Sequence, residues 1–279
     1  MEPVAHFISS WDGLKLHVLE WCGGDSRLPL LCLPGIVRTG GDFAGVAELL
    51  GEGRRVVSLD YAGRGRSGRA AEPARYAPEA CLRDILDVCA ALHLHRVGVI
   101  GTSFGGLLSM GLAAARPGLI GAVVLNDIGP DIGVGGAAFV RRFVGHDPAL
   151  PDLEACVAYL RSVLPPLSLS TDEEWRTMAR LTYAQDGGGL FRPVWDTRIA
   201  GLLDAPRPDL WTLFGALAHV PVLMVRGEVS DILLPETVAR MQEERPDMMV
   251  VSVDGVGHAP TLSEPVAAEA VRAFLERLG

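Results

Sequence analysis

The sequence of 279 residues predicts an α/β fold, a mostly parallel sheet with helices on both faces, from three observations. Short apolar runs alternate with helix-like segments from residue 28 to residue 125. The motif Gly101-Thr-Ser103-Phe-Gly105 stands between an apolar run and an Ala/Leu-rich segment. The alternation then stops at residue 127, gives way to helical pieces rich in glycine and proline, and returns at residue 221.

The first element is a predicted β-hairpin. The segments His6–Ser10 and Leu14–Leu19 alternate between apolar and polar residues, and Asp12-Gly13 between them is a turn sequence. Buried strands are expected to follow at Leu28–Leu33, Arg54–Leu59, Val97–Gly101, Ile120–Leu125, Pro221–Arg226 and Met248–Val253. Helices of the same unit are expected at Asp42–Leu50, Pro78–Leu92, Phe104–Arg116, Pro235–Met241 and Glu264–Leu278.

The stretch between the two strand-bearing parts is predicted to be a helical insertion. Helical pieces such as Asp152–Val163 and Asp172–Tyr183 occur there without intervening strands. We therefore predict a core domain formed by residues 1–126 and 214–279, interrupted by an insertion of residues 127–213.

Composition excludes several classes of protein. The net charge of −9, without a cluster of basic residues, argues against a nucleic-acid partner. No uncharged run is long enough to span a membrane, and no signal peptide opens the chain. The five cysteines are irregularly spaced, and several lie in apolar segments, so we expect free buried thiols and a cytoplasmic location.

One glycine pattern is not assigned a function. The run Gly63-Arg-Gly65-Arg-Ser-Gly68 satisfies G-x-G-x-x-G, but a dinucleotide site needs a helix that begins at the third glycine. A loop broken by Pro73 follows instead, so we do not predict a nucleotide cofactor.

Ser103 is the predicted nucleophile. A glycine on either side of the serine, two residues away, leaves room for a tight turn from strand to helix, which projects the hydroxyl above the sheet. A buried strand thiol, Cys32, is the other nucleophilic group that we considered, and we expect it to pack as a small apolar side chain.

His258 is the predicted base. A serine hydroxyl needs a base within hydrogen-bond reach, and that base needs a carboxylate to orient it. Among seven histidines, His258 follows the last expected strand and precedes the last helix. Reactive groups of open α/β sheets collect on loops at the carboxyl ends of strands, where Ser103 also lies.

Two aspartates compete for the role of the orienting acid. Asp231 follows the penultimate expected strand, and the apolar residues after it could bury it beside the base. Asp127, at the end of the strand after Ser103, could also reach the site. We prefer Asp231 on chain order, which places the acid between the nucleophile and the histidine. Glu228 is expected to be a solvated turn residue.

Two backbone N–H groups are expected to hold a negatively charged oxygen. Phe104 supplies one as the residue after the nucleophile. Ile36 is expected to supply the other, because Gly35 in the loop after the strand Leu28–Leu33 allows a close approach of the backbone. The alternative is that the glycines of this loop only build a turn.

These motifs resemble the α/β-hydrolase superfamily. The resemblance is carried from about Leu14 to the C-terminus by Leu33-Pro-Gly-Ile, Asp60-Tyr-Ala-Gly-Arg-Gly-Arg-Ser, Gly101-Thr-Ser-Phe-Gly-Gly, Gly227-Glu-Val-Ser-Asp231 and Gly257-His-Ala-Pro. It implies an eight-stranded core sheet, a helical cap formed by the insertion, no cofactor and no metal site. Ser103, Asp231 and His258 match the triad positions, whereas Pro34-Gly35 replaces the His-Gly of many relatives.

The resemblance implies a serine hydrolase that forms an acyl-enzyme on Ser103 and cleaves a small or medium carboxylic ester, lactone or thioester. The alternatives are C–C bond hydrolysis of a diketo acid, acyl transfer, and a ligand receptor without catalysis. Substrate-pocket candidates besides Asp127 are Arg38, Arg192 and Trp195, of which the arginines could hold a carboxylate. The alternative, which we favour, is that these residues pack the cap or are solvated. The predicted partner is a small molecule, and the sequence leaves monomer and homodimer open.

Overall fold

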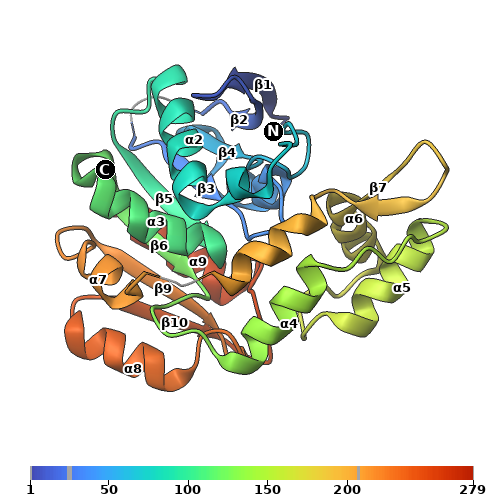
Figure 1. Cartoon of the computed structure of the whole chain (residues 1–279). Coiled ribbons are helices and arrows are strands. Elements are labelled where there is room, and N and C mark those ends of the chain that lie inside the picture. Colours follow the sequence, from blue (N-terminus) through green and yellow to red (C-terminus); the bar gives the residue numbers. More distant parts are fainter. Residues whose placement is uncertain (1, 24–26, 206–207, 279) are drawn as a thin grey trace.

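The computed structural model describes residues 2–23, 27–205 and 208–278, and its centre is an eight-stranded sheet (Figure 1). The strands, in the spatial order β1-β2-β4-β3-β5-β6-β9-β10, are β1 (Val4–Ser9), β2 (Lys15–Trp21), β4 (Val56–Leu59), β3 (Leu30–Leu33), β5 (Val97–Thr102), β6 (Ile120–Asn126), β9 (Val222–Gly227) and β10 (Met249–Val253). β2 runs antiparallel to β1 and β4, and the strands from β4 to β10 are parallel. The predicted hairpin and parallel sheet are therefore confirmed.

Helices cover both faces because successive strand residues point to opposite sides. In β3, Leu31 and Leu33 belong to one apolar cluster, and Leu30 and Cys32 belong to the other. The first cluster contains buried side chains of α2 (Pro78–Ala91), α3 (Phe104–Ala115), α7 (Leu210–Gly215) and α8 (Pro235–Glu244). The second contains those of α1 (Ala44–Leu50) and α9 (Pro265–Glu276). The sheet is thus the middle of three layers.

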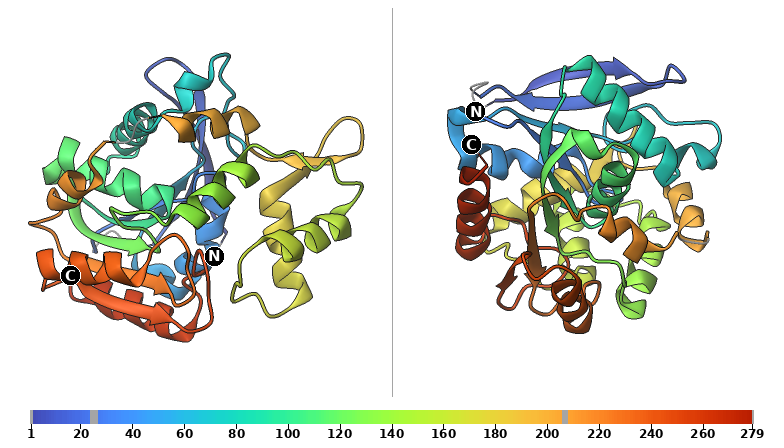
Figure 2. Two further views of the ribbon diagram at one scale, coloured as in Figure 1. Left: turned by 60° about the horizontal axis from the view of Figure 1, so that its bottom comes forward. Right: turned by 90° about the vertical axis from the view of Figure 1, so that its left-hand side faces the viewer.

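The insertion between β6 and β9 forms a lobe beside the sheet (Figures 1 and 2). It contains α4 (Val134–Val144), α5 (Leu153–Val163), α6 (Asp172–Thr182) and a 3₁₀ helix, Thr197–Asp204. It also contains a small antiparallel sheet of β7 (Tyr183–Gln185) and β8 (Phe191–Pro193), which the expectation of helices without strands missed. These strands are only three residues long, too short to show a periodic pattern.

The loop after β4 also behaves as expected. Residues 63–68 form turns, and no helix begins at Gly68, so the glycine run lacks the context of a dinucleotide site. Within the described ranges, no helix combines the length and apolar character needed to cross a bilayer. All five cysteines are free, and Cys22 is exposed whereas the other four are buried.

Candidate active site

Ser103 occupies the tight turn between β5 and α3. Its backbone has φ 53° and ψ −116°, in a region that L-residues rarely adopt. A Cβ on Gly101 would lie 2.6 Å from the Gly105 backbone, and one on Gly105 would lie 1.9 Å from the Leu33 carbonyl oxygen. Glycine is therefore required on both sides of the serine for the strand and the helix to approach this closely.

His258 lies within hydrogen-bond distance of this serine. Its Nε2 is 2.8 Å from Ser103 Oγ, and its side chain is mostly buried. The loop that carries it follows β10, so its position at the carboxyl end of the parallel sheet is the expected one. The two side chains are 155 positions apart in the sequence and meet because β5 and β10 end at the same edge of the sheet.

The carboxylate that contacts His258 belongs to Asp127, and the preference for Asp231 was wrong. His258 Nδ1 is 2.8 Å from Asp127 Oδ2, and the Asp127 carboxylate is fully buried. The Gly227 N–H donates to Asp127 Oδ1 at 2.9 Å. Because an ionised carboxylate only accepts hydrogen bonds, His258 carries its proton on Nδ1, and Nε2 is left to accept the Ser103 proton.

Ser230, and not Asp231, is the residue of the loop after β9 that contacts the Asp127 carboxylate. The Ser230 hydroxyl donates to Asp127 Oδ2 at 2.6 Å and accepts from the Ile232 and Leu233 N–H groups at 3.2 Å. This loop therefore contributes a hydroxyl that supports the carboxylate, whereas the next residue, Asp231, has an exposed side chain. Asp127 directly follows β6, the strand beside β5, and has a positive φ of 55°.

The loop after β3 lies next to the serine. A Cβ built on Gly35 would be 4.0 Å from Ser103 Cβ, so a side chain there would contact the nucleophile. The N–H groups of Ile36 and Phe104 have no acceptor among the residues that the structure describes. Two unpaired donors beside a serine hydroxyl can hold the negatively charged oxygen of a tetrahedral intermediate.

Ser103 and His258 open into a cavity of about 670 Å³ between the core and the insertion. Most of its lining is aliphatic or aromatic, including Phe43 from the core and Phe143, Leu160 and Leu181 from the insertion. Such a cavity suits a small, mainly apolar ligand that is oriented by a few polar groups.

Arg38 lines this cavity, but its guanidinium is already paired. Nε and Nη2 donate to the two carboxylate oxygens of Asp42 at 2.7 and 2.6 Å, and Nη1 donates to Thr182 Oγ1 at 2.6 Å. Arg38 thus joins the loop after β3 to the C-terminal end of α6 in the insertion.

The other three pocket candidates lie outside the cavity, and Arg192 and Trp195 fit the favoured alternative of a solvated arginine and cap packing. Arg192 is partly exposed and forms ion pairs with Asp147 and Asp186. Trp195 is 2% exposed, and its indole N–H donates to the Val144 carbonyl. Neither residue lines the cavity. Asp127 is also absent from the lining, because it lies behind His258.

Sequence reasoning missed two residues that support the site, Ser230 and Asn126. The Asn126 side-chain NH₂ donates to the Pro260 carbonyl at 2.8 Å and to Thr102 Oγ1 at 3.1 Å. It therefore ties the loop of His258 to the end of β5. A polar Asn-Asp pair that ends a fully apolar strand was the available signal, since polar groups at a buried strand end need partners.

Other reactive groups do not take part. Burial raises the pKa of the Cys32 thiol far above its usual range, so this cysteine stays protonated inside the sheet. Among the described residues, no three His, Cys, Asp or Glu side chains are grouped so that they could hold a metal ion.

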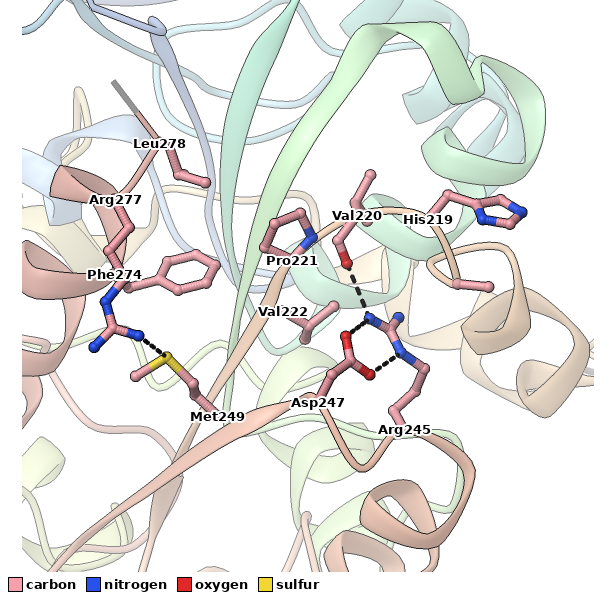
Figure 3. A pocket seen from close by; sticks show the side chains of 11 residues that line it. His219, Val220, Pro221, Val222, Arg245, Asp247, Met249, Phe274, Arg277 and Leu278 are labelled. Carbon is pink, nitrogen blue, oxygen red and sulfur yellow. Dashed lines mark hydrogen bonds and ion pairs between the residues drawn. The ribbon is translucent and has the colours of Figure 1, made fainter.

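A second hollow of about 460 Å³ lies at the other end of the sheet, where β9 and β10 begin (Figure 3). Arg245 is held by Asp247, at 2.7 and 2.9 Å, and by main-chain carbonyls, and Arg277 contacts the Met249 sulfur. In Figure 3 the His219 ring points away from Arg245 and Asp247. The residues that line this hollow include no nucleophile and base in contact, whereas the lining of the other cavity includes Ser103 and His258.

The chain resembles known hydrolases over nearly its full length. It is 36% identical to a 3-hydroxybutyrate-oligomer hydrolase of Cupriavidus necator, with 94% of each chain covered. It is 26% identical to a 2-(acetamidomethylene)succinate hydrolase of Mesorhizobium japonicum, over 97% of this chain and 96% of the relative.

A solved structure agrees closely with this one. The crystal structure of an alpha/beta hydrolase from Novosphingobium aromaticivorans has a TM-score of 0.93 and 37% identity, with 99% of each chain covered. Residues 30–271 match the sequence pattern of the alpha/beta hydrolase family. That span runs from β3 into α9 and includes Ser103, Asp127 and His258. The chain therefore belongs to the alpha/beta hydrolase family.

Proposed function

We propose that this hydrolase cleaves carboxylic esters through an acyl-enzyme on Ser103, with His258 as the base and Asp127 as the acid that orients it. One observation carries the proposal: a continuous hydrogen-bond chain runs from Ser103 Oγ to His258 and on to Asp127, with 2.8 Å at each step. A neutral histidine held in this way can take the serine proton as the oxygen attacks a carbonyl carbon.

The reaction has two halves. In the first, Ser103 Oγ bonds to the carbonyl carbon, His258 takes the serine proton, and the N–H groups of Ile36 and Phe104 hold the oxyanion. His258 then gives the proton to the leaving alcohol as the ester C–O bond breaks. In the second half, water loses a proton to His258 and attacks the acyl carbon. His258 then returns the proton to Ser103 Oγ as the bond between Oγ and the acyl carbon breaks, and the acid product leaves.

Short oligoesters of 3-hydroxybutyrate are the first substrates to examine. The Cupriavidus necator relative is named for such an oligomer and aligns over 94% of this chain. The cavity is lined mostly by apolar side chains and is large enough for a chain of several carbon atoms. Arg192 lies outside the cavity and Arg38 is paired with Asp42, so neither is a free anchor for a substrate carboxylate, which a 3-hydroxybutyrate oligomer and a diketo acid both carry.

The test is a substrate panel measured with the wild type and Ser103→Ala. It contains p-nitrophenyl esters of two to eight carbons, a 3-hydroxybutyrate dimer and trimer, and a ring-cleavage diketo acid. We expect turnover of the esters and the dimer, and a loss of about 10³-fold or more in Ser103→Ala with an unchanged circular dichroism spectrum.

Three results would contradict the proposal. Turnover of the diketo acid alone would assign C–C hydrolysis. Product formation that requires an added alcohol or thiol acceptor would assign acyl transfer. Tight binding of these compounds without turnover by the wild type would assign a receptor.

A further inference from the structure

Arg64 is a buried arginine behind the loop that carries Ile36. The residue is 1% exposed, and its guanidinium lies among three aromatic rings. Its Cζ atom is 5.6 Å from the ring centre of Tyr61, 5.7 Å from that of Tyr76 and 5.9 Å from that of Phe104. Aromatic faces attract a cation, but they neutralise no charge.

No carboxylate among the described residues forms an ion pair with Arg64. Its Nε donates to the Ile36 carbonyl at 2.9 Å, and its Nη1 donates to the Ala62 carbonyl at 2.7 Å. Its Nη2 is buried and has no hydrogen-bond partner within the part of the chain that the structure describes. The charge of Asp84 raises the pKa of Arg64, but the two side chains do not form an ion pair, and Asp84 is paired with Arg75. Burial lowers the pKa of Arg64, but an arginine stays protonated at neutral pH.

An unpaired buried charge is expensive to keep, and residues that carry such a cost cluster at functional sites. The position of Arg64 suggests what the charge is for. It lies against both residues proposed as oxyanion donors: its Nε donates to the Ile36 carbonyl, and its guanidinium lies over the ring of Phe104. Arg64 does not line the cavity, so it does not touch a substrate there.

We infer that Arg64 is a positioning residue of the oxyanion hole: it fixes the loop of Ile36, and its uncompensated positive charge favours the negative oxygen of the tetrahedral intermediate. This inference rests on the proposed function, because the Ile36 and Phe104 N–H groups are oxyanion donors only in the reaction proposed for Ser103. A fixed cation at a site of low dielectric constant stabilises charge that develops in the transition state more than it stabilises the neutral ester.

Arg54 provides a matched control. It is also buried, at 2% exposed, and its guanidinium also donates to main-chain carbonyls, those of Leu28 and Leu275, at 2.6 and 3.0 Å. Burial lowers its pKa as well. Arg54 lies just before β4, away from the carboxyl ends of the strands where Ser103 is found. The two arginines therefore share burial and type of partner, and only Arg64 is next to the proposed oxyanion donors.

The experiment compares Arg64→Met, Arg64→Lys and Arg54→Met in the full chain. An alkylboronic acid is the probe: Ser103 Oγ donates an electron pair to boron, His258 takes the serine proton, and the adduct is a tetrahedral anion.

For Arg64→Met we expect kcat for a p-nitrophenyl ester and boronate affinity each to fall about 100-fold, as when an oxyanion donor is lost, with KM changed less than threefold. Thermal stability should be equal or higher, because the unpaired charge is gone. Arg64→Lys should lose no more than about tenfold, and Arg54→Met should keep both kcat and boronate affinity.

The outcomes separate this inference from the proposed function. If the wild type turns over esters and binds the boronate, but Arg64→Met does so equally well, only the role of Arg64 is overturned. If the wild type does neither, the proposed function fails and the inference falls with it. If Arg64→Met does not fold, Arg64→Lys decides: a loss greater than 100-fold despite the retained charge overturns the role of the charge.

Discussion

Two His–Asp pairs in this protein have the same geometry and different surroundings. In the site, His258 Nδ1 lies 2.8 Å from Asp127 Oδ2. At the base of the N-terminal hairpin, His17 Nδ1 lies 2.8 Å from Asp60 Oδ2. Each carboxylate is buried and accepts further hydrogen bonds, which for Asp60 come from the Gly40 and Arg66 N–H groups.

The difference lies at the second ring nitrogen. The Nε2 atom of His258 faces the Ser103 hydroxyl, which can give up a proton, beside a cavity. The Nε2 atom of His17 lies 3.3 Å from an Arg66 guanidinium nitrogen, and His17 does not line that cavity. A His–Asp pair is therefore not sufficient for catalysis. The group that faces Nε2 of the histidine, and access to a ligand, decide whether the pair moves a proton or holds loops together.

Replacing the two candidate acids separately should give the largest contrast. Asp127→Asn removes the charge that orients and stabilises protonated His258, and we expect kcat/KM for ester hydrolysis to fall about 10³- to 10⁴-fold. Asp231→Asn is the matched control on the neighbouring loop and should keep activity within about twofold, because its side chain is exposed. A strong loss in Asp231→Asn with an active Asp127→Asn would return the role to Asp231.

Replacing His17 should have the opposite effect from replacing Asp127: the stability of the fold should fall, and the ester-cleaving activity should be retained. His17→Gln leaves the buried Asp60 carboxylate with one fewer donor, and we expect the free energy of unfolding in urea to fall by about 1–3 kcal/mol. The folded enzyme should keep kcat within about threefold, since His17 lies outside the site. His6→Gln, on the same hairpin but partly exposed, should change stability less. A kcat loss in His17→Gln comparable with that of Asp127→Asn would show that the second pair is also part of the catalytic site.

A smaller effect is expected at Arg38, which joins the loop of Ile36 to the insertion. Arg38→Met breaks its hydrogen bonds to Asp42 and Thr182, so the wall of the cavity should hold substrate less well. We expect KM for a neutral ester to rise about two- to fivefold with kcat nearly unchanged, the loss of a modest polar interaction. If KM rises only for substrates that bear a carboxylate, Arg38 binds that carboxylate instead.

The smallest effect is expected at Arg192. Its ion pairs with Asp147 and Asp186 are partly exposed and lie outside the cavity lining. Arg192→Ala should leave kcat and KM for neutral and anionic substrates within about twofold of the wild type. A specific rise of KM for diketo acids would place Arg192 in the substrate site after all.

The sheet was predictable because its signals are local. Apolar runs such as Val97–Gly101 and the glycines around Ser103 each define a strand or a turn without reference to the rest of the chain. The aspartate that contacts His258 could not be predicted in the same way, because β6 and β9 are neighbours and both Asp127 and Asp231 follow a strand that ends at the site. The turn after β9 decides which side chain points inward, and it selects Ser230.

The insertion was hardest to predict. Trp195 and Arg192 are close in sequence, but one packs against α4 and the other pairs at the surface, and no periodic pattern in so short a segment separates the two. The partner of Arg38 in the insertion, Thr182, is 144 residues away, so the sequence alone could not show this contact.

The rate at which a fluorophosphonate labels the protein, with the modified residue mapped by peptide mass spectrometry, tests whether Ser103 is a nucleophile activated by His258 and Asp127. We expect a single adduct on Ser103 in the wild type, fast labelling in Asp231→Asn, and labelling slowed by about 10³-fold or more in His258→Ala and Asp127→Asn. An adduct at another residue, or equal rates in Asp127→Asn and the wild type, would contradict this role of Ser103 and its two partners.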